Sequence, residues 1–295
     1  MAGLKEIRRR IRSVENTKKI TRAMKLVSAA KLRKAQEAVY TAREYCDALS
    51  LLIRELSVEV FQQAVEHPLL MPKSEVKSVG YVVVGGSKGL CGAYNTNVHK
   101  IAAGLIRKQL EVTPPLQVDA LLLGKKPVDY FRRNRLPFAD SYVELPADPN
   151  HWPIEPICQK IENGYKTGRA DEVYLVYTKF YSAVSVKVTV EKLLPLDVSL
   201  LGKVADAPLP NGVTLYEPSA DAVFGEVVPR ILRARVWLSC LEAVASEFGS
   251  RMSAMDSATN NATELLDKLR LRRNKLRQTG ITSEILDIIG GSAVE

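Results

Sequence analysis

The most constraining feature of this sequence is a long stretch near its start that contains neither glycine nor proline. After Gly3, the next such residue is Pro68. Because the strongest helix breakers are missing, the stretch predicts one helix over residues 3–60, about 85 Å long at 1.5 Å per residue. Helices in globular proteins average about 11–12 residues. A single helix this long therefore needs a partner helix that buries its apolar stripe.

The apolar stripe of this first helix is strong at both ends and weak in the middle. Large aliphatic and aromatic residues form its ends, whereas small or polar residues and one methionine form its centre. Small residues let another helix approach closely but make a poor zipper between identical chains. The predicted stripe consists of Leu4, Ile7, Ile11, Val14, Thr17, Thr21, Met24, Ser28, Ala35, Ala38, Ala42, Tyr45, Leu49, Leu52 and Leu56.

A second long helix is predicted over residues 219–289. Ser219 follows a proline and is a suitable N-cap, with Asp221 in the first turn. Pro229 marks either a kink or the true start of the helix. Steps of three and four, typical of a coiled-coil seam, continue over many turns. The predicted seam consists of Ile231, Ala234, Leu238, Leu241, Ala245, Phe248, Met252, Met255, Thr259, Ala262, Leu266, Leu269, Arg273 and Leu276.

The middle of the chain alternates strands with helices, which predicts an α/β domain on a largely parallel sheet. The whole chain is therefore expected to hold a Rossmann-like α/β domain, residues 75–215, between two long terminal helices, residues 1–62 and 219–290. These helices pair as an antiparallel coiled coil, and their unequal lengths predict that part of the second lacks a partner. The predicted strands are 80–84, 118–123, 172–180 and 185–193, and the predicted helices are 95–110, 126–134 and 154–166.

The net charge of +9 is concentrated at the start of the chain. Residues 1–36 hold twelve Lys or Arg and two acids, so the rest of the chain is close to neutral. Such a segment favours an acidic partner, which could be nucleic acid, an anionic membrane or a protein. The segment has no aromatic residue before Tyr40, so it cannot stack on bases. We therefore favour an acidic protein surface and keep a basic coiled-coil nucleic-acid-binding protein as the alternative.

The glycine cluster of residues 85–95 follows a predicted strand, where a nucleotide site lies in many α/β folds. Its sequence, GGSKGLCGAYN, matches neither G-x-G-x-x-G nor GxxxxGK[ST]. We therefore favour a structural turn over a nucleotide-using enzyme, the third hypothesis. The histidines and cysteines have neither triad nor metal-ligand spacing. No catalytic, cofactor-binding or metal-binding residue is expected.

Targeting signals are not apparent in the sequence. No apolar run approaches the ~20 residues that cross a bilayer, and the N-terminus has no secretory h-region. Glu6 and Glu15 interrupt an arginine run that could imitate a transit peptide. The four separated cysteines are expected to be reduced thiols of a cytosolic compartment.

Three strings, in order along the chain, resemble the signatures of F-type ATP synthase gamma subunits. Residues 13–34 read SVENTKKITRAMKLVSAAKLRK, and residues 89–95 contain GLCG with Asn95 at the position of the family's GLCG-x-x-N motif. Residues 247–262 read EFGSRMSAMDSATNNA, continued by NKLRQ at 274–278 and ITSEI at 281–285. The resemblance covers essentially the whole chain.

The resemblance implies a non-catalytic rotor shaft, present once in the complex. It implies that rotation of the c-ring, driven by protons, is coupled through the shaft to the catalytic sites on the beta subunits. The implied partners are the hexamer of alpha and beta subunits, the epsilon subunit and the c-ring, with no cofactor and no nucleic acid. The implied location is the cytoplasmic side of the bacterial inner membrane, and no insert of the thiol-switched chloroplast form is visible.

The resemblance also assigns contact residues by matching positions. Two sets are implied, one between rotor and stator and one near the c-ring. The rotor–stator residues are Met24, Lys25, Arg251, Gln278, Thr282 and Glu284, and the residues near the c-ring are Tyr216 and Glu217.

Overall fold

The structure, a computed structural model, describes residues 2–62, 67–197 and 215–292. The chain divides into two compact units. Residues 1–30 with 251–295 form what we call the paired-helix unit, and residues 31–250 form the α/β unit. Two long helices, α1 (Ala2–Gln62) and α5 (Ala220–Ser292), contribute to both units. The predicted fold class, an α/β domain between two long terminal helices, is confirmed.

A five-stranded sheet forms the centre of the α/β unit, in the order β3-β2-β1-β4-β5. Strands β1 to β4 run parallel, and β5 returns antiparallel to β4. Every residue of β1 is buried, as expected for a central strand of a parallel sheet covered on both faces. The strands are β1 (Ser78–Val84), β2 (Gln117–Leu123), β3 (Asp140–Tyr142), β4 (Glu172–Phe180) and β5 (Val186–Leu194).

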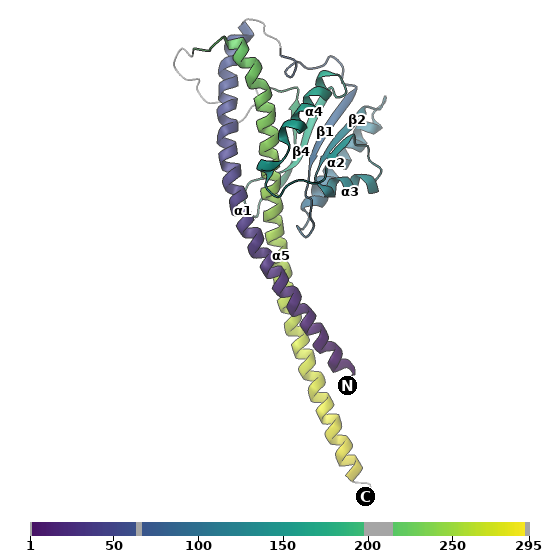
Figure 1. Ribbon diagram of the computed structural model, residues 1–295. Helices are drawn as coiled ribbons and strands as arrows, with labels where there is room; N and C mark the ends of the chain where they lie inside the picture. Colours follow the sequence, from purple (N-terminus) through teal and green to yellow (C-terminus); the bar gives the residue numbers. More distant parts are fainter. Residues whose placement is uncertain (1, 63–66, 198–214, 293–295) are drawn as a thin grey trace. The chain divides into compact units, whose positions relative to one another are not determined.

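Helices cover both faces of this sheet (Figure 1). The first face carries α2 (Tyr94–Glu111) and α3 (Lys125–Arg133), whose apolar side chains pack on alternate residues of β1, such as Tyr81 and Val83. The other face carries α4 (Ile154–Lys166) together with the adjoining parts of α1 and α5. The long helices are therefore part of the same hydrophobic core as the sheet in this unit.

The paired-helix unit is an antiparallel helix pair. Arg270 Nη2 lies 3.0 Å from Glu15 Oε1, and Lys25 Nζ lies 2.6 Å from Asp256 Oδ1. The higher-numbered residue of α1 thus contacts the lower-numbered residue of α5, so the two helices are antiparallel. Ile7 and Ile11 form a small apolar cluster with Leu266 and Leu269.

The predicted seam of α5 follows the observed burial as far as Leu269. Up to that residue every predicted seam position is buried or half-buried, whereas Leu276 is exposed. From Leu271 to Thr282 no side chain of the described residues is buried. Ser219 accepts a hydrogen bond at 3.2 Å from the Ala222 amide, which is the predicted N-cap, and α5 runs through Pro229 without a break.

Two stripe positions of α1, Thr17 and Tyr45, were predicted wrongly, because both side chains are exposed. Tyr45 is 48% exposed, and Cys46 takes its place in the interface with its thiol 3.5 Å from the Ala234 carbonyl oxygen. After Ala42 the seam therefore advances by four residues rather than three. The reason is that α1 packs here against both α5 and the α/β core, where Ile53 and Leu56 are buried.

Candidate functional site

The predicted contact residues of the paired-helix unit lie in different environments. Met24 is half-buried. Lys25 is about half-exposed and forms the ion pair with Asp256, so its charge is shared with α5. Arg251 is only 7% exposed. Its guanidinium therefore lies mainly within the protein, which favours a role in holding the unit together as well as any contact with a partner.

Two of the predicted residues near the end of α5 lie on the surface. Gln278 and Thr282 are exposed, and the Thr282 hydroxyl donates to the Gln278 carbonyl oxygen at 2.9 Å. Apolar residues of the same segment are exposed as well, including Ile281 at 49% and Leu286 at 63%. Glu284 lies within α5, but its side chain falls outside the described residues.

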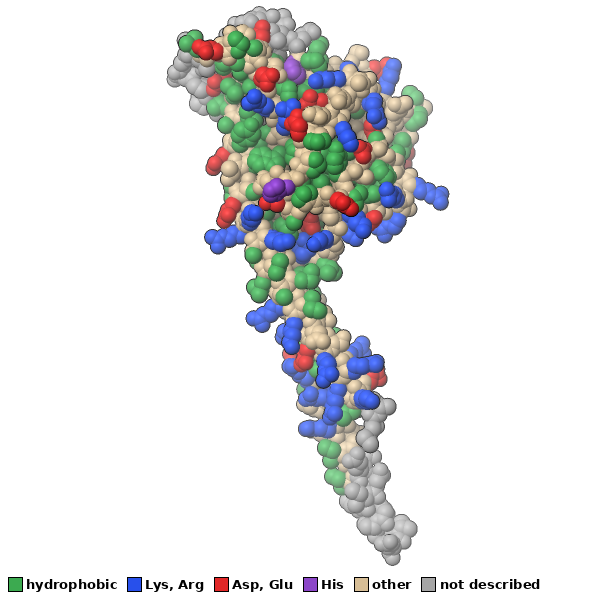
Figure 2. Space-filling view, viewed as in Figure 1, with side chains coloured by type: hydrophobic (Ala, Val, Ile, Leu, Met, Phe, Trp, Pro, Cys, Tyr) green, Lys and Arg blue, Asp and Glu red, His purple; other side chains and the backbone are tan. Residues whose placement is uncertain are grey.

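Sequence reasoning missed a group of exposed apolar residues on α1. Ile20, Leu26 and Val27 are 60%, 64% and 56% exposed. Cations lie between and beside them, and Figure 2 shows Lys and Arg side chains gathered over this unit. The sequence could have indicated them, because these apolar residues lie outside the seam of Thr21, Met24 and Ser28 and therefore face away from α5.

The two predicted residues near the c-ring precede α5. Tyr216 is half-buried and packs against the core that α4 and α5 share with the sheet. Glu217 is exposed, and the neighbouring Leu215 is 87% exposed. Only the phenol ring of Tyr216 is held by the α/β unit, so Leu215 and Glu217 present their side chains to solvent.

The glycine cluster is a tightly packed turn at the carboxyl end of β1. The Gly86 amide donates to Asn95 Oδ1 at 2.9 Å, and the Asn95 amide nitrogen donates to the Lys88 carbonyl oxygen at 3.1 Å. A Cβ at Gly86 would lie 3.0 Å from a carboxylate oxygen of Glu247. An acidic group from α5 thus occupies the switch point between β1 and β4, where α/β folds bind phosphates.

Two thiols and one histidine inside the α/β unit are held in neutral forms. Burial raises the pKa of the Cys46 and Cys158 thiols to about 12, which disfavours the nucleophilic thiolate. Burial, together with the nearby Arg133 and Lys126, lowers the pKa of His99 to about 4. Within residues 2–62, 67–197 and 215–292, no group of three or more His, Cys, Asp or Glu is placed to hold a metal ion. Among the same residues, no helix has the length and hydropathy needed to span a bilayer.

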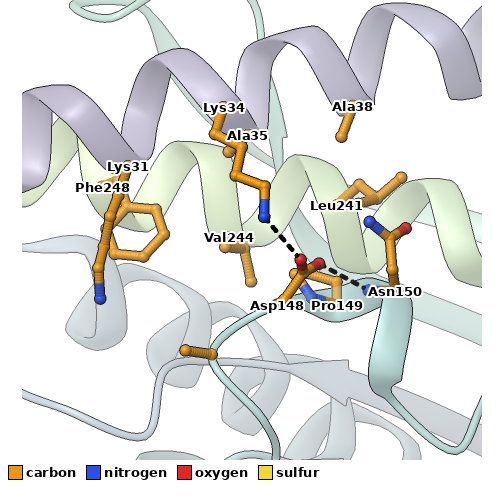
Figure 3. Close-up of a pocket in the computed structure, with 11 residues that line it drawn as sticks. Lys31, Lys34, Ala35, Ala38, Asp148, Pro149, Asn150, Leu241, Val244 and Phe248 are labelled. Carbon is orange, nitrogen blue, oxygen red and sulfur yellow. Dashed lines mark hydrogen bonds and ion pairs between the residues drawn. The ribbon is translucent and has the colours of Figure 1, made fainter.

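A small cavity of about 160 Å³ lies between α1, α5 and the loop before α4 (Figure 3). Alanine and aliphatic side chains line much of it, with Ala35 and Ala38 on α1 facing Leu241 and Val244 on α5. At its edge Lys34 Nζ lies 3.1 Å from Asp148 Oδ2. The lining residues pack the two helices against the loop and form one surface ion pair. None of them is a nucleophile paired with a base, so the cavity has no catalytic arrangement.

Comparisons with known proteins assign this chain to one family. The family model described as ATP synthase matches residues 3–294. The ATP synthase gamma chain of Heliobacterium modesticaldum is 40% identical over 297 residues, which cover 99% of either chain. The gamma chain of Bdellovibrio bacteriovorus is 39% identical over 295 residues, covering 99% of this chain and 98% of that one.

Solved structures show the same fold. A chain of the Euglena gracilis mitochondrial ATP synthase, in a structure of OSCP, F1 and c-ring, aligns with a TM-score of 0.66 and 18% identity, covering 99% of this chain and 94% of that chain. A chain of the central stalk and c-ring structure from Tetrahymena thermophila aligns with a TM-score of 0.58 and 23% identity, covering 81% and 99%. With the full-length match to the family model and to bacterial relatives, the conclusion is that this chain belongs to the ATP synthase gamma chain family.

Proposed function

We propose that this chain is the rotating shaft of an ATP synthase, coupling movement of the c-ring to conformational change at catalytic sites on the beta subunits. The observation that carries the proposal is the antiparallel helix pair joined to an α/β domain in a member of this family. A shaft acts on catalytic sites only through contacts that differ between the conformations of those sites. The surface of the helix pair is therefore the functional site.

The surface chemistry of the paired-helix unit suits contacts that must be exchanged. Exposed Ile20, Leu26 and Val27 provide apolar area, and the cations around them attract acidic loops of the surrounding alpha and beta subunits. Exposed ion pairs are worth about 0–1 kcal/mol each, so they are easily broken as the shaft turns. We propose that Met24, Lys25, Arg251, Gln278, Thr282 and Glu284 contribute to these contacts.

The shaft is proposed to carry out no chemistry of its own. Glu247 next to Gly86 places negative charge where a nucleotide phosphate would bind, which disfavours phosphate there. The nucleic-acid alternative has only the basic segment of α1 in its favour, and we propose that this segment contacts acidic proteins instead.

As a member of this family the chain is part of a membrane-associated complex. We propose that its α/β unit forms the foot on the c-ring with the epsilon subunit, with Tyr216 and Glu217 near the ring. We also propose that a single copy lies on the cytoplasmic side of a bacterial inner membrane. These assignments rest on the family resemblance and on the position of Leu215 and Glu217 at the surface.

Co-purification tests the proposed function. The chain is tagged at its α/β unit and isolated under gentle extraction, and its partners are identified by mass spectrometry. Alpha, beta and epsilon subunits are expected in stoichiometric amounts, with ATP hydrolysis in the complex and none in the chain alone. Leu26→Asp is expected to weaken recovery of the alpha and beta subunits, whereas Thr41→Asp, also an exposed position on α1, is the matched control. Absence of these subunits from the wild-type preparation would refute the proposal.

A further inference from the structure

A buried junction in the α/β unit joins α1, α5 and the sheet through one side chain. Arg43 on α1 donates from Nε to Glu242 Oε1 on α5 at 2.9 Å. Its Nη2 donates to the same carboxylate oxygen and to the backbone carbonyl oxygen of Phe180 at the end of β4. One guanidinium on α1 therefore bonds to two other elements, α5 and β4, that are far from it and from each other in the sequence.

The carboxylate at this junction is almost completely buried. The Glu242 side chain is 2% exposed, and that of Arg43 is 31% exposed. Glu242 Oε2 has no hydrogen-bond partner among the described residues. Since a buried carboxylate is costly without compensation, Glu242 depends on the guanidinium of Arg43.

The same face of α5 contacts the end of β4 at successive turns. Ser246 Oγ donates to the Thr178 carbonyl oxygen at 3.0 Å. A Cβ at Gly249 would lie 3.1 Å from the Ala183 carbonyl oxygen in the β4–β5 turn. Residues 242, 246 and 249 are spaced by four and three, so they lie on one face of the helix. This face fixes α5 to the sheet, and Arg43 fixes α1 to both.

Apolar packing alone would fix these elements less firmly. The core between the long helices and the sheet consists of aliphatic side chains such as Ile53, Leu56 and Leu232. Hydrophobic contacts have no preferred direction, whereas a guanidinium donates along fixed directions in one plane. The junction therefore adds the directional bonds that define the angle of the sheet around the two helices.

We propose that Arg43 is a positioning residue for torque transfer, which locks the α/β domain to the two long helices so that they turn as one body. The proposal rests on the proposed function of the chain as a shaft. Glu242 and the Phe180 carbonyl are the acceptors of this lock. Lysine at position 43 would keep the charge but lose the second direction, because its ammonium lacks the planar fork.

The functional test uses the assembled complex in sealed vesicles, where ATP-driven proton pumping and ATP hydrolysis are both measured. For Arg43→Ala we expect the ratio of pumping to hydrolysis to fall by about fivefold or more, because the variant removes three hydrogen bonds and leaves the buried Glu242 carboxylate without its cation. Arg43→Lys should lie between this variant and the wild type. Arg169→Ala is the matched control, because it removes an exposed ion pair to Asp119 on β2 and should leave the ratio unchanged.

A second measurement keeps the test decisive if the activity of a variant is low. Spin labels carried by noncanonical amino acids are placed at the exposed positions 41 on α1 and 187 on β5 of the full chain, and the distribution of distances between them is recorded. Arg43→Ala and Glu242→Gln should broaden this distribution, whereas Arg169→Ala should not.

Each outcome decides the proposal. A broader distribution with a lower pumping ratio supports it. An unchanged distribution overturns the lock, and a broader distribution with an unchanged ratio overturns its role in torque transfer. Parallel loss of pumping and hydrolysis in Arg43→Ala, with no change in their ratio, shows a purely structural residue and also overturns it. If the wild-type chain forms no hydrolysing complex, the proposed function fails, and the distance measurement still reports on the lock.

Discussion

At the scale of single residues, His99 is a buried histidine that must stay neutral. It is 5% exposed and stacks on Tyr130 with ring centroids 4.9 Å apart. Its pKa is lowered to about 4, first by burial and then by Arg133 and Lys126. In the unfolded chain the pKa of histidine is about 6.5, so the unfolded state takes up a proton first as the pH falls. The contribution of His99 to stability is therefore complete above about pH 6.5 and is lost toward pH 4.

We predict that His99→Gln removes this part of the acid sensitivity. The wild-type chain should lose up to about 3 kcal/mol of unfolding free energy from this group between pH 7 and pH 4. The variant should show a correspondingly flatter dependence in urea unfolding at several pH values. His151→Gln, which replaces an exposed histidine, is the control and should follow the wild type. Equal slopes for His99→Gln and the wild type would contradict the prediction.

A second residue-scale prediction concerns the polar position in the helix pair. Thr21 Oγ1 and Thr259 Oγ1 lie 2.8 Å apart, and Thr21 is buried. Thr21→Val alone should cost about 1–2 kcal/mol, because it removes one partner and leaves the other hydroxyl less well paired. The double variant Thr21→Val with Thr259→Val should recover part of this loss. Thermal unfolding of the wild type, the single variants Thr21→Val and Thr259→Val, and the double variant gives the coupling, and strictly additive changes would show that the two hydroxyls do not interact.

At the scale of elements, the turns around the sheet depend on backbone approach. Gly124, between β2 and α3, has φ +100°, and a Cβ there would collide with the Gly85 carbonyl oxygen. We predict that Gly124→Ala destabilises the chain by more than about 2 kcal/mol, since it combines strain at positive φ with a clash against backbone.

The matched control for this prediction is a glycine in α2, which covers the same face of the sheet as α3. Gly104 is within α2 and has open space around it, so Gly104→Ala should stabilise the chain by up to about 1 kcal/mol. Chemical denaturation of both variants gives two changes of opposite sign. A mild effect of Gly124→Ala would show that the turn can move away from the collision.

The elements were largely predictable because their signals are local. The absence of glycine and proline indicated α1, and steps of three and four indicated the α5 seam up to Leu269. The short strand β3 (Asp140–Tyr142) was missed, since three residues give no alternation to detect. The shift from Tyr45 to Cys46 in the seam was also missed, because it depends on where the α/β core meets α1.

The contact surface was less predictable than the fold. The resemblance selected positions along α1 and α5, but the ion pair between Lys25 and Asp256 and the burial of Arg251 follow from the pairing of two distant segments. The Arg43–Glu242 junction likewise joins residues about two hundred positions apart. One sequence holds no direct signal for such a pair, so only the structure shows it.

At the scale of the whole molecule, we expect the end of α5 to contribute to assembly and little to the stability of the chain. The described side chains from Leu271 to Thr282 are exposed or half-buried. We predict that deletion of residues 280–295 changes the unfolding free energy of the isolated chain by less than about 0.5 kcal/mol, as for surface changes.

The same deletion should weaken binding to the ring of alpha and beta subunits, because it removes exposed Ile281 and Ile285. The two readouts are thermal unfolding of the isolated chain and recovery of alpha and beta subunits with the tagged chain. A deleted chain that unfolds like the wild type and recovers these subunits equally well would exclude this segment from the contact surface.

The pairing of Ile7 and Ile11, near the start of the chain, with Leu266 and Leu269 has a consequence for biosynthesis. Ile7 and Ile11 leave the ribosome long before Leu266 and Leu269 exist, so their apolar surface stays uncovered while most of the chain is made. Closing such a long loop is slow compared with local folding, and the α/β unit can fold first. The nascent chain thus carries a basic, partly apolar amphipathic arm until translation ends, which makes it a substrate for chaperones and proteases in that interval.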